Sequence, residues 1–254
     1  MKYNFYEYLI YEDNHLLIIN KPANLLSQAD NTKDPDVVNL AKDYLKFQYN
    51  KPGNVYVGLV HRLDRMTEGV LVLAKTSKAA SRLSDAIKAN EWHKSYIALV
   101  HGHIDKGTKL TNYLDHVDDT KKMQVVKPGN GQKAELIFDV LGYVGDNTVI
   151  KINLLTGRHH QIRVQLAAFG HPLVGDTLYG NPKEKIDLML CCISITFKHP
   201  TLDKYLEINC LPKSKKWSKI FCILFFRRRP SLHDWCKSYV NLFGRFTFCV
   251  FVTY

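Results

Sequence analysis

Apolar side chains form short unbroken runs in some stretches of the chain and recur at helical spacing in others. The unbroken runs predict buried strands at residues 15–20, 58–60, 70–74 and 95–100. Helical spacing predicts two amphipathic helices, over residues 37–45 and 78–90. We expect the first helix to begin with Asp34 as its N-cap and Pro35 as its first helical residue.

The second half of the chain predicts further strands and one more helix. Glycine and charged residues dominate residues 101–133, which predicts loops or a short excursion over the surface. Residues 134–143 and 148–155 predict an antiparallel pair joined by a Gly-Asp-Asn turn. A helix is expected to open at Gly157 and to close at Gly170. Because helices and strands mix without strict strand–helix–strand alternation, the predicted fold class is α+β.

Length and charge narrow the class of partner. A chain of 254 residues is long enough for a full core, as one large domain or as two lobes around a cleft. Lys and Arg number 35 against 24 Asp and Glu, and the net charge of +11 favours a polyanionic partner. Nucleic acid fits better than a membrane, because no apolar run approaches the roughly 18 residues of a spanning helix. A basic protein without a special partner is the other interpretation.

The N-terminal residues and the cysteines each predict that a feature is absent. Residues 1–7 show no secretory apolar segment and no cleavage site, so we expect a cytoplasmic protein. The 6 cysteines include no Cys-x-x-Cys pair and no Cys/His spacing of the zinc type. We therefore predict buried free thiols, with neither a disulfide framework nor a metal site.

The segment between the second and third predicted strands holds the main candidate for chemistry. Asp64 stands between Arg62 and Arg65 in a predicted loop. A carboxylate paired with either arginine stays ionised at neutral pH and keeps one orientation. The alternative is an aspartate that caps a turn through its own backbone.

Four stretches together resemble one enzyme family. Residues 61–69, His-Arg-Leu-Asp-Arg-Met-Thr-Glu-Gly, resemble the His-Arg-Leu-Asp-x-x-Thr-x-Gly signature of the RluA-type pseudouridine synthases, which modify RNA. Residues 156–166 resemble the family's Thr-Gly-Arg-x-His-Gln-Ile-Arg block, and residues 170–180 its Gly-His-Pro-x-x-Gly-Asp-x-x-Tyr-Gly continuation. Residues 94–98 are similar to its Lys-x-Tyr-x-Ala strand. With weaker matches at both ends, the resemblance covers residues 10–220.

The resemblance implies a role for each matched residue. Asp64 is the expected nucleophile, which forms a covalent adduct with the sugar of a flipped-out uridine or attacks its base. Tyr96 is expected to stack on the base and support proton transfer, and Arg163 to pair with Asp64. Core packing is the alternative for Tyr96, and a solvated helix face the alternative for Arg163. The expected substrate-binding residues are Arg62, Arg158, His160, Gln161 and Ile195.

The resemblance also implies an architecture and a function. The family fold is a mixed, mainly antiparallel central sheet flanked by helices, with a catalytic cleft, and we expect it over residues 1–221. Residues 222–254 are rich in aromatics and cysteine and carry Arg227-Arg228-Arg229, which predicts an extension foreign to the fold or a contact to RNA or membrane. The expected function is isomerisation of specific uridines in rRNA or tRNA, by a monomer that recognises structured RNA and needs no cofactor or metal.

Three departures from the family pattern keep two rival functions open. Glu68 stands where the family usually has Ser, His159 where it has Thr, and Cys191 where it often has His. A second carboxylate near Asp64 would raise the pKa of that aspartate unless the arginines compensate. One rival is a catalytically impaired RNA-binding protein or RNA folding helper on the same scaffold. The other is a glycoside hydrolase that uses Asp64 and Glu68 as paired carboxylates.

Overall fold

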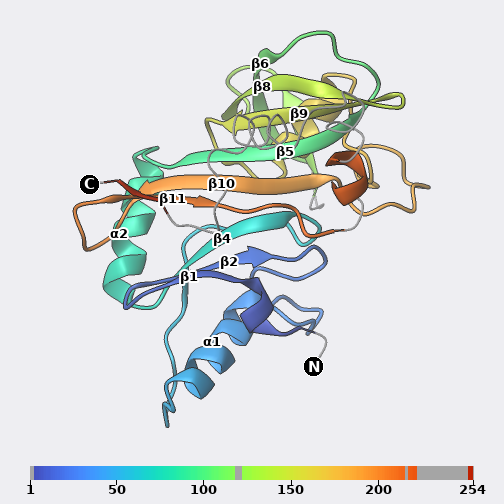
Figure 1. Cartoon of the computed structure of the whole chain (residues 1–254). Helices are drawn as coiled ribbons and strands as arrows, with labels where there is room; N and C mark the ends of the chain where they lie inside the picture. The colour runs from blue at the N-terminus through green and yellow to red at the C-terminus, as the bar shows by residue number, and fades with distance from the viewer. Residues whose placement is uncertain (1–2, 118–121, 215–216, 222–250, 254) are drawn as a thin grey trace. The chain divides into compact units, whose positions relative to one another are not determined.

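The computed structural model describes residues 3–117, 122–214, 217–221 and 251–253, and the predicted extension, residues 222–254, lies almost entirely outside them. The described chain forms two compact units (Figure 1). The first contains the residues up to His93 and Cys192–Cys210. The second contains Lys94–Cys191 and the described residues from Leu211 to Phe221. The α+β class is confirmed.

The first unit is built on an antiparallel arrangement of β1, β2 and β4, followed by β10 and β11. Its strands are β1 (Leu9–Glu12), β2 (Leu16–Lys21), β3 (Gly58–Leu59), β4 (Glu68–Ala74), β10 (Leu190–Lys198), β11 (Tyr205–Asn209) and β12 (Phe251–Thr253). The short strand β3 adds to β4, and β12 adds to β11. Every residue of β2 and β4 is buried, which explains why both read as unbroken apolar runs rather than as alternating strands.

Two α-helices and a short 3-10 helix complete the first unit. They are η1 (Phe5–Tyr8), α1 (Val37–Gln48) and α2 (Ser77–Lys88). The N-cap of α1 is Asp36, whose carboxylate accepts the backbone N–H of Asn39, so the prediction of Asp34 as the cap was wrong by two residues. Asp34 instead pairs with Arg65. The cap of α2 is Thr76, and α2 packs on β3 and β4.

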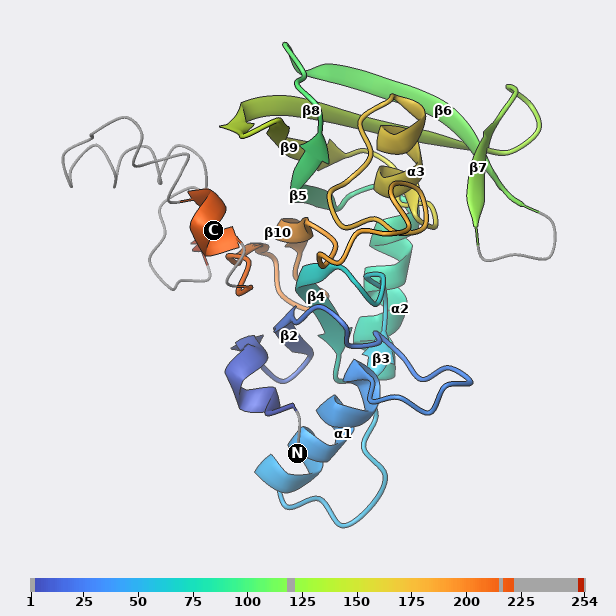
Figure 2. The same cartoon turned by 90° about the vertical axis from the view of Figure 1, so that its right-hand side faces the viewer.

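The second unit is an antiparallel sheet in the order β5, β9, β8, β6, β7, with one helix (Figure 2). Its elements are β5 (His93–His101), β6 (Thr108–His116), β7 (Met123–Val126), β8 (Gln132–Val144), β9 (Asn147–Leu154) and α3 (Gln161–Ala168). The predicted hairpin is confirmed as β8 and β9. Helix α3 contacts β6 and β7, and Leu114, Met123, Ala134 and Val164 form a buried cluster against which Tyr179 packs.

Two predictions for the second unit were wrong. Residues 101–133 are not mainly loops, because they contain β6 and β7. Their strand pattern is masked by charge, since side chains such as Lys109 lie on an exposed face of the sheet. Helix α3 begins at Gln161 rather than at Gly157, because His160 is in the left-handed region (φ 52°). Its predicted end is close to the observed one, with Gly170 at φ +90° just beyond the last turn.

Among the described residues, no helix is both long enough and apolar enough to cross a membrane.

Candidate active site

Asp64 lies in the loop between β3 and β4 of the first unit, and it is half-buried. Its backbone carbonyl accepts the N–H of Thr67 (3.0 Å), so the residue opens a turn. That bond uses only the main chain. The turn therefore fixes the backbone of Asp64 without determining what its carboxylate does.

The residues on both sides of Asp64 are held by distant segments of the chain. Ser27 Oγ donates to the carbonyl of Leu63 (2.6 Å) and accepts the N–H of the same residue (3.2 Å). The buried Lys21 Nζ donates to the carbonyl of Arg65 (3.2 Å). An aspartate flanked by two anchored neighbours keeps its position without help from a substrate, which is what a preorganised catalytic group needs.

The two arginines of the loop have different environments. Arg62 is exposed. Arg65 is also exposed, and its Nη1 lies 2.7 Å from Asp34 Oδ2. This ion pair ties the loop to the segment before α1. The pairing of Asp64 with Arg62 or Arg65 stays a prediction.

His61 marks the point where the loop leaves the sheet. Strand β3 ends at Leu59, which is paired with Leu73, and the backbone N–H of Val72 donates to His61 Nε2 (3.0 Å). The imidazole thus takes the place of the backbone carbonyl that would accept the N–H of Val72 if β3 continued along β4. Its ring also contacts Trp92 edge-on, with the centroids 5.3 Å apart. In the sequence His61 stands out only as the first residue of the signature, and nothing in the chain indicates that its ring accepts a backbone N–H.

The last two residues of the signature, Glu68 and Gly69, begin β4. Glu68 is only 4% exposed, so its carboxylate does not lie on the surface. Gly69 has φ +122°, and a Cβ there would lie 2.2 Å from the carbonyl oxygen of Cys192 on β10. Only glycine permits this approach of two strands. The structure therefore explains why the signature ends in glycine.

Arg163 is buried in α3 of the second unit, 7% exposed, so the surface alternative was wrong. Its Nε and Nη2 donate to Asp176 Oδ2 and Oδ1, both at 2.8 Å. Burial alone would raise the pKa of Asp176, but Arg163 and the N–H groups of Tyr179 and Leu178 outweigh it and hold that pKa below its usual range. Asp176 was not among the predicted site residues, although its place in the Gly-Asp of a matched block was the available signal.

The residues around the start of α3 form a tight turn. Gln161 Oε1 accepts from the backbone N–H of Arg158 (3.0 Å) and from Thr156 Oγ1 (2.8 Å). Arg158 is exposed, and its Nε donates to the carbonyl of Lys133. His160 Nδ1 lies 2.9 Å from Tyr179 Oη. The amide of Gln161 thus shapes the turn, while Arg158 and the imidazole of His160 lie at its surface side.

Tyr96 and Ile195 both lie on strands. Tyr96 is buried on β5, opposite Ile152 of β9, and Ile195 is buried on β10, opposite Ile208 of β11. These positions agree with the core alternative and leave the predicted roles untested. Across the chain, the first unit contains Arg62, Asp64 and Ile195, and the second contains Tyr96, Arg158, His160, Gln161 and Arg163.

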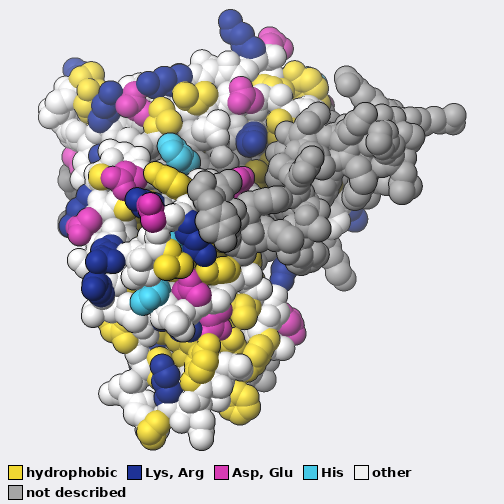
Figure 3. Space-filling model, turned by 60° about the vertical axis from the view of Figure 1, so that its left-hand side comes forward, with side chains coloured by type: hydrophobic (Ala, Val, Ile, Leu, Met, Phe, Trp, Pro, Cys, Tyr) yellow, Lys and Arg dark blue, Asp and Glu magenta, His cyan; other side chains and the backbone are white. Residues whose placement is uncertain are grey.

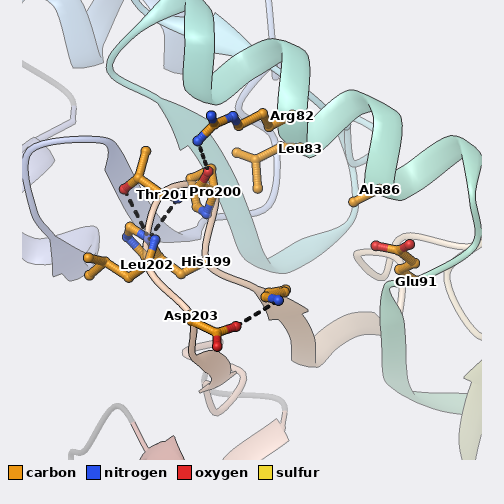
Figure 4. A pocket seen from close by; sticks show the side chains of 10 residues that line it. Arg82, Leu83, Ala86, Glu91, His199, Pro200, Thr201, Leu202 and Asp203 are labelled. Atoms are coloured by element: carbon orange, nitrogen blue, oxygen red, sulfur yellow. Dashed lines mark hydrogen bonds and ion pairs between the residues drawn. The ribbon is translucent and has the colours of Figure 1, made fainter. Parts of the chain in front are cut away.

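A hollow of about 350 Å³ lies in the first unit, between α2 and the turn from β10 to β11 (Figure 4). None of the predicted site residues lines it. Arg82 Nη1 donates to the carbonyl of Pro200 (2.7 Å) at its upper wall, and His199 Nδ1 accepts the N–H of Leu202 (3.0 Å). These two hydrogen bonds hold the turn between β10 and β11 in place. Because no predicted site residue lines the hollow, we do not place the reaction there.

On the face shown in Figure 3, basic and acidic side chains are interspersed rather than gathered in one patch.

Comparisons with known proteins found a matching family model and similar proteins. A family model described as RNA pseudouridylate synthase matches residues 15–168. The dual-specificity RNA pseudouridine synthase RluA of Escherichia coli K12 is 32% identical over 76% of this chain and 87% of its own length. The ribosomal large subunit pseudouridine synthase D of Yersinia pestis is 35% identical over 68% of this chain and 52% of its own.

Solved structures show the same fold. The human RNA pseudouridylate synthase domain containing 4 aligns with a TM-score of 0.70 at 22% identity, over 89% of this chain and 94% of that one. The human RNA pseudouridylate synthase domain containing 1 aligns with a TM-score of 0.66 at 23% identity, over 80% and 82%. At these identities the likeness concerns the fold. Together with the sequence relatives, it shows that this chain belongs to the RNA pseudouridylate synthase family and is an isomerase of the RluA type.

Proposed function

We propose that this protein isomerises specific uridines of rRNA or tRNA to pseudouridine, with Asp64 as the nucleophile. The observation that carries the proposal is a half-buried carboxylate in a loop whose flanking backbone is anchored on both sides. It stands within the signature of a family whose relatives are named for this reaction.

The proposed chemistry rearranges one nucleotide and consumes nothing else. The Asp64 carboxylate attacks C1′ of an extruded uridine, and the N1–C1′ bond breaks as the uracil leaves with the electron pair. The base then turns, C5 attacks C1′ and the carboxylate is displaced. C5 loses its proton and N1 gains one, so the product is an isomer of the substrate. Attack of Asp64 on the uracil ring is the other route open to the same group.

Arg163 and Tyr96 have supporting roles in the proposal. A guanidinium has five N–H donors arranged in a planar fork. Two of the donors of Arg163 bind Asp176, and these bonds fix the plane of its guanidinium. We assign the other edge of this fork to Asp64. Tyr96 supports the detached base, because its ring can stack on a pyrimidine and its hydroxyl can exchange a proton.

The remaining predicted residues hold the RNA. We assign the phosphates to Arg62 and Arg158, both exposed, because guanidinium groups bind phosphate oxygens strongly. His160 and Gln161 follow Arg158 at the start of α3, and we assign Ile195 to the wall of the uridine pocket. We further propose that residues 1–221 form the catalytic domain and act as a monomer in the cytoplasm, without a metal or cofactor.

Family membership favours this function over both rivals. A glycoside hydrolase would need a second carboxylate that reaches its substrate, and Glu68 is buried in β4. An RNA folding helper would bind RNA without forming pseudouridine. That rival is separated from the enzyme by the experiment on Asp64.

The test replaces Asp64 by Asn, which keeps the shape of the side chain but cannot attack. RNA from cells that lack the gene is incubated with the wild-type protein or the variant, and pseudouridines are mapped. We expect Asp64→Asn to form none while it melts at the wild-type temperature and binds RNA with nearly wild-type affinity.

The matched control is Asp43→Asn, an exposed aspartate of α1, which should retain full activity. Appreciable turnover by Asp64→Asn would contradict the assignment of the nucleophile. RNA binding without turnover by the wild-type protein would favour the folding helper.

A further inference from the structure

A continuous series of ring contacts runs through the second unit from strand β6 to Arg163. The ring of His116 lies 5.8 Å from that of His159, which stacks on His160 at 3.9 Å with an angle of 25°. His160 meets the Tyr179 ring edge-on at 5.6 Å, and the guanidinium of Arg163 lies 5.1 Å from the centroid of the same ring. We call these rings the imidazole column.

The backbone explains how the column forms. His160 is in the left-handed conformation immediately before α3, so the chain turns sharply between His159 and Gln161. The turn brings two consecutive imidazoles face to face, which an extended or helical backbone does not do for neighbouring residues. Tyr179 fixes the inner end, because its hydroxyl lies 2.9 Å from His160 Nδ1 and accepts the N–H of Met123 at 2.8 Å.

The column is not needed to hold the β6–β7 hairpin on α3. A buried apolar cluster already does so, with Leu114 and Met123 from the hairpin and Val164 from the helix. The outer member, His116, is exposed at the end of β6. A series of ring contacts with a stacked pair at its centre and a tilted, exposed imidazole at its outer end can accept one more flat ring.

The surroundings suit a nucleotide. Exposed Arg158 precedes His159, and exposed Lys122 lies with its Nζ 5.8 Å from the Tyr179 ring. Asp115 is the acidic neighbour of His116 in sequence, and Asp176 is engaged by Arg163. Single-stranded RNA bases stack on histidine and aromatic rings, and their phosphates pair with nearby cations. A protein side chain would gain little from this combination.

We propose that His116 and His159 form a stacking site for an unpaired base of the RNA next to the target uridine. The proposal rests on the proposed function, which assigns His160 to the RNA and Arg163 to the nucleophile Asp64. It extends that function, because neither His116 nor His159 belongs to the family signature, in which position 159 is Thr. The imidazole column would thereby select RNA in which the neighbour of the target is also unpaired.

The test uses the RNA that the wild-type enzyme modifies, with 2-aminopurine placed beside the target uridine. Stacking quenches the fluorescence of this base. Binding is measured in the Asp64→Asn background, and turnover in the otherwise wild-type enzyme. We expect His116→Ala and His159→Thr to relieve the quenching, to weaken binding about tenfold and to raise KM by a similar factor, while kcat changes by less than about twofold.

Two further variants make the result specific. His159→Phe keeps a flat ring and should recover binding to within about threefold of wild type. His103→Ala removes an exposed imidazole of the same unit that contacts Tyr143 outside the column, and it should leave quenching and KM unchanged. Melting temperatures show whether each variant is folded, and His116 is exposed enough for its replacement to be tolerated.

The outcomes separate this inference from the function on which it rests. Wild-type quenching and KM in both His116→Ala and His159→Thr would overturn the stacking site while pseudouridine formation stands. Loss of quenching that His159→Phe restores would support it. If the wild-type protein modifies no RNA, the proposed function fails and the stacking site fails with it.

Discussion

Arg163 is oriented by a residue 13 positions further along the chain, which prepares it for the role that we propose. The two parallel hydrogen bonds to Asp176 fix the orientation of a guanidinium that is almost fully buried. The lowered pKa of Asp176 keeps this carboxylate ionised at neutral pH, so the pair needs no adjustment when RNA binds.

Replacing Arg163 by Lys tests this preparation. Lysine keeps the charge but not the planar fork, so it cannot pair with Asp176 in the same bidentate way and orient a second group. We expect the single-turnover rate at saturating enzyme to fall at least roughly tenfold, about 1.4 kcal/mol. Arg82→Lys, a change at an exposed arginine of the first unit, is the control and should leave the rate unaltered. A wild-type rate for Arg163→Lys would reject the role.

At the scale of elements, Glu12 joins β1 to the end of α1 and to the end of β4. Its carboxylate accepts the hydroxyls of Tyr44 and Tyr49, both at 2.7 Å, and the ammonium of Lys75 at 2.5 Å. Burial would raise the pKa of Glu12, but Lys75 and the two tyrosines outweigh it, and the pKa is lowered. The helix therefore depends on an ionised carboxylate.

Glu12→Gln should lower the free energy of unfolding at pH 7 by about 2 kcal/mol, because hydrogen bonds to a charged group are removed. A group with a lowered folded pKa contributes fully above its unfolded pKa, here 4.5, and loses the contribution as the pH falls through the folded pKa. The difference between wild type and Glu12→Gln should thus hold from pH 7 to about pH 5 and shrink below 4.5. Urea unfolding across this range measures it, with the exposed Glu91→Gln as control. A constant difference at all pH values would contradict it.

The start of the loop that contains Asp64 depends in a similar way on one imidazole. His61→Phe keeps a ring against Trp92 but leaves the N–H of Val72 without its acceptor, which costs about 1–3 kcal/mol in the free energy of unfolding. His61→Gln offers an amide oxygen in its place and should recover part of the loss. Replacement of the exposed His93 by Phe is the control. Chemical denaturation decides, and full stability of His61→Phe would show that the bond is dispensable.

At the scale of the whole molecule, the boundary between the region that resembles the family and the extension after it matters most. Residues 217–221 form a helical turn in which Trp217 is 0% exposed and Ile220 is buried. The resemblance to the family signature ends at the same place. A cut after Phe221 therefore keeps the buried indole and removes the predicted extension together with β12, which adds to β11.

Truncation after Phe221 should preserve turnover and raise solubility, because the segment removed is aromatic-rich and cysteine-rich. Affinity for RNA should show the same salt dependence as the full chain. If Arg227–Arg229 bind RNA instead, the slope of log affinity against log salt would fall by about 0.7 to 0.9 for each phosphate that the shortened chain no longer neutralises. Truncation after Ser214, which removes Trp217 as well, is the comparison and should lower the melting temperature.

The sequence alone determined the features that depend on neighbouring residues. Unbroken apolar runs identified β2 and β4, and alternation with a glycine turn identified the β8–β9 hairpin, because burial on one or both faces of a strand imprints a local pattern. The signature around Asp64 identified the family for the same reason, since its residues are consecutive. Strands β6 and β7 escaped detection because an exposed sheet face selects polar residues that also suit loops.

Only the tertiary structure decided which distant groups meet. Asp176 as the partner of Arg163, the N–H of Val72 as the donor to His61, and the ring contact of His116 with His159 each join segments that the chain separates. No local pattern encodes such pairs, because each depends on where the backbone places two elements rather than on the residues beside them. The sequence showed which chemical group stands at each position, whereas folding determined which partners orient that group.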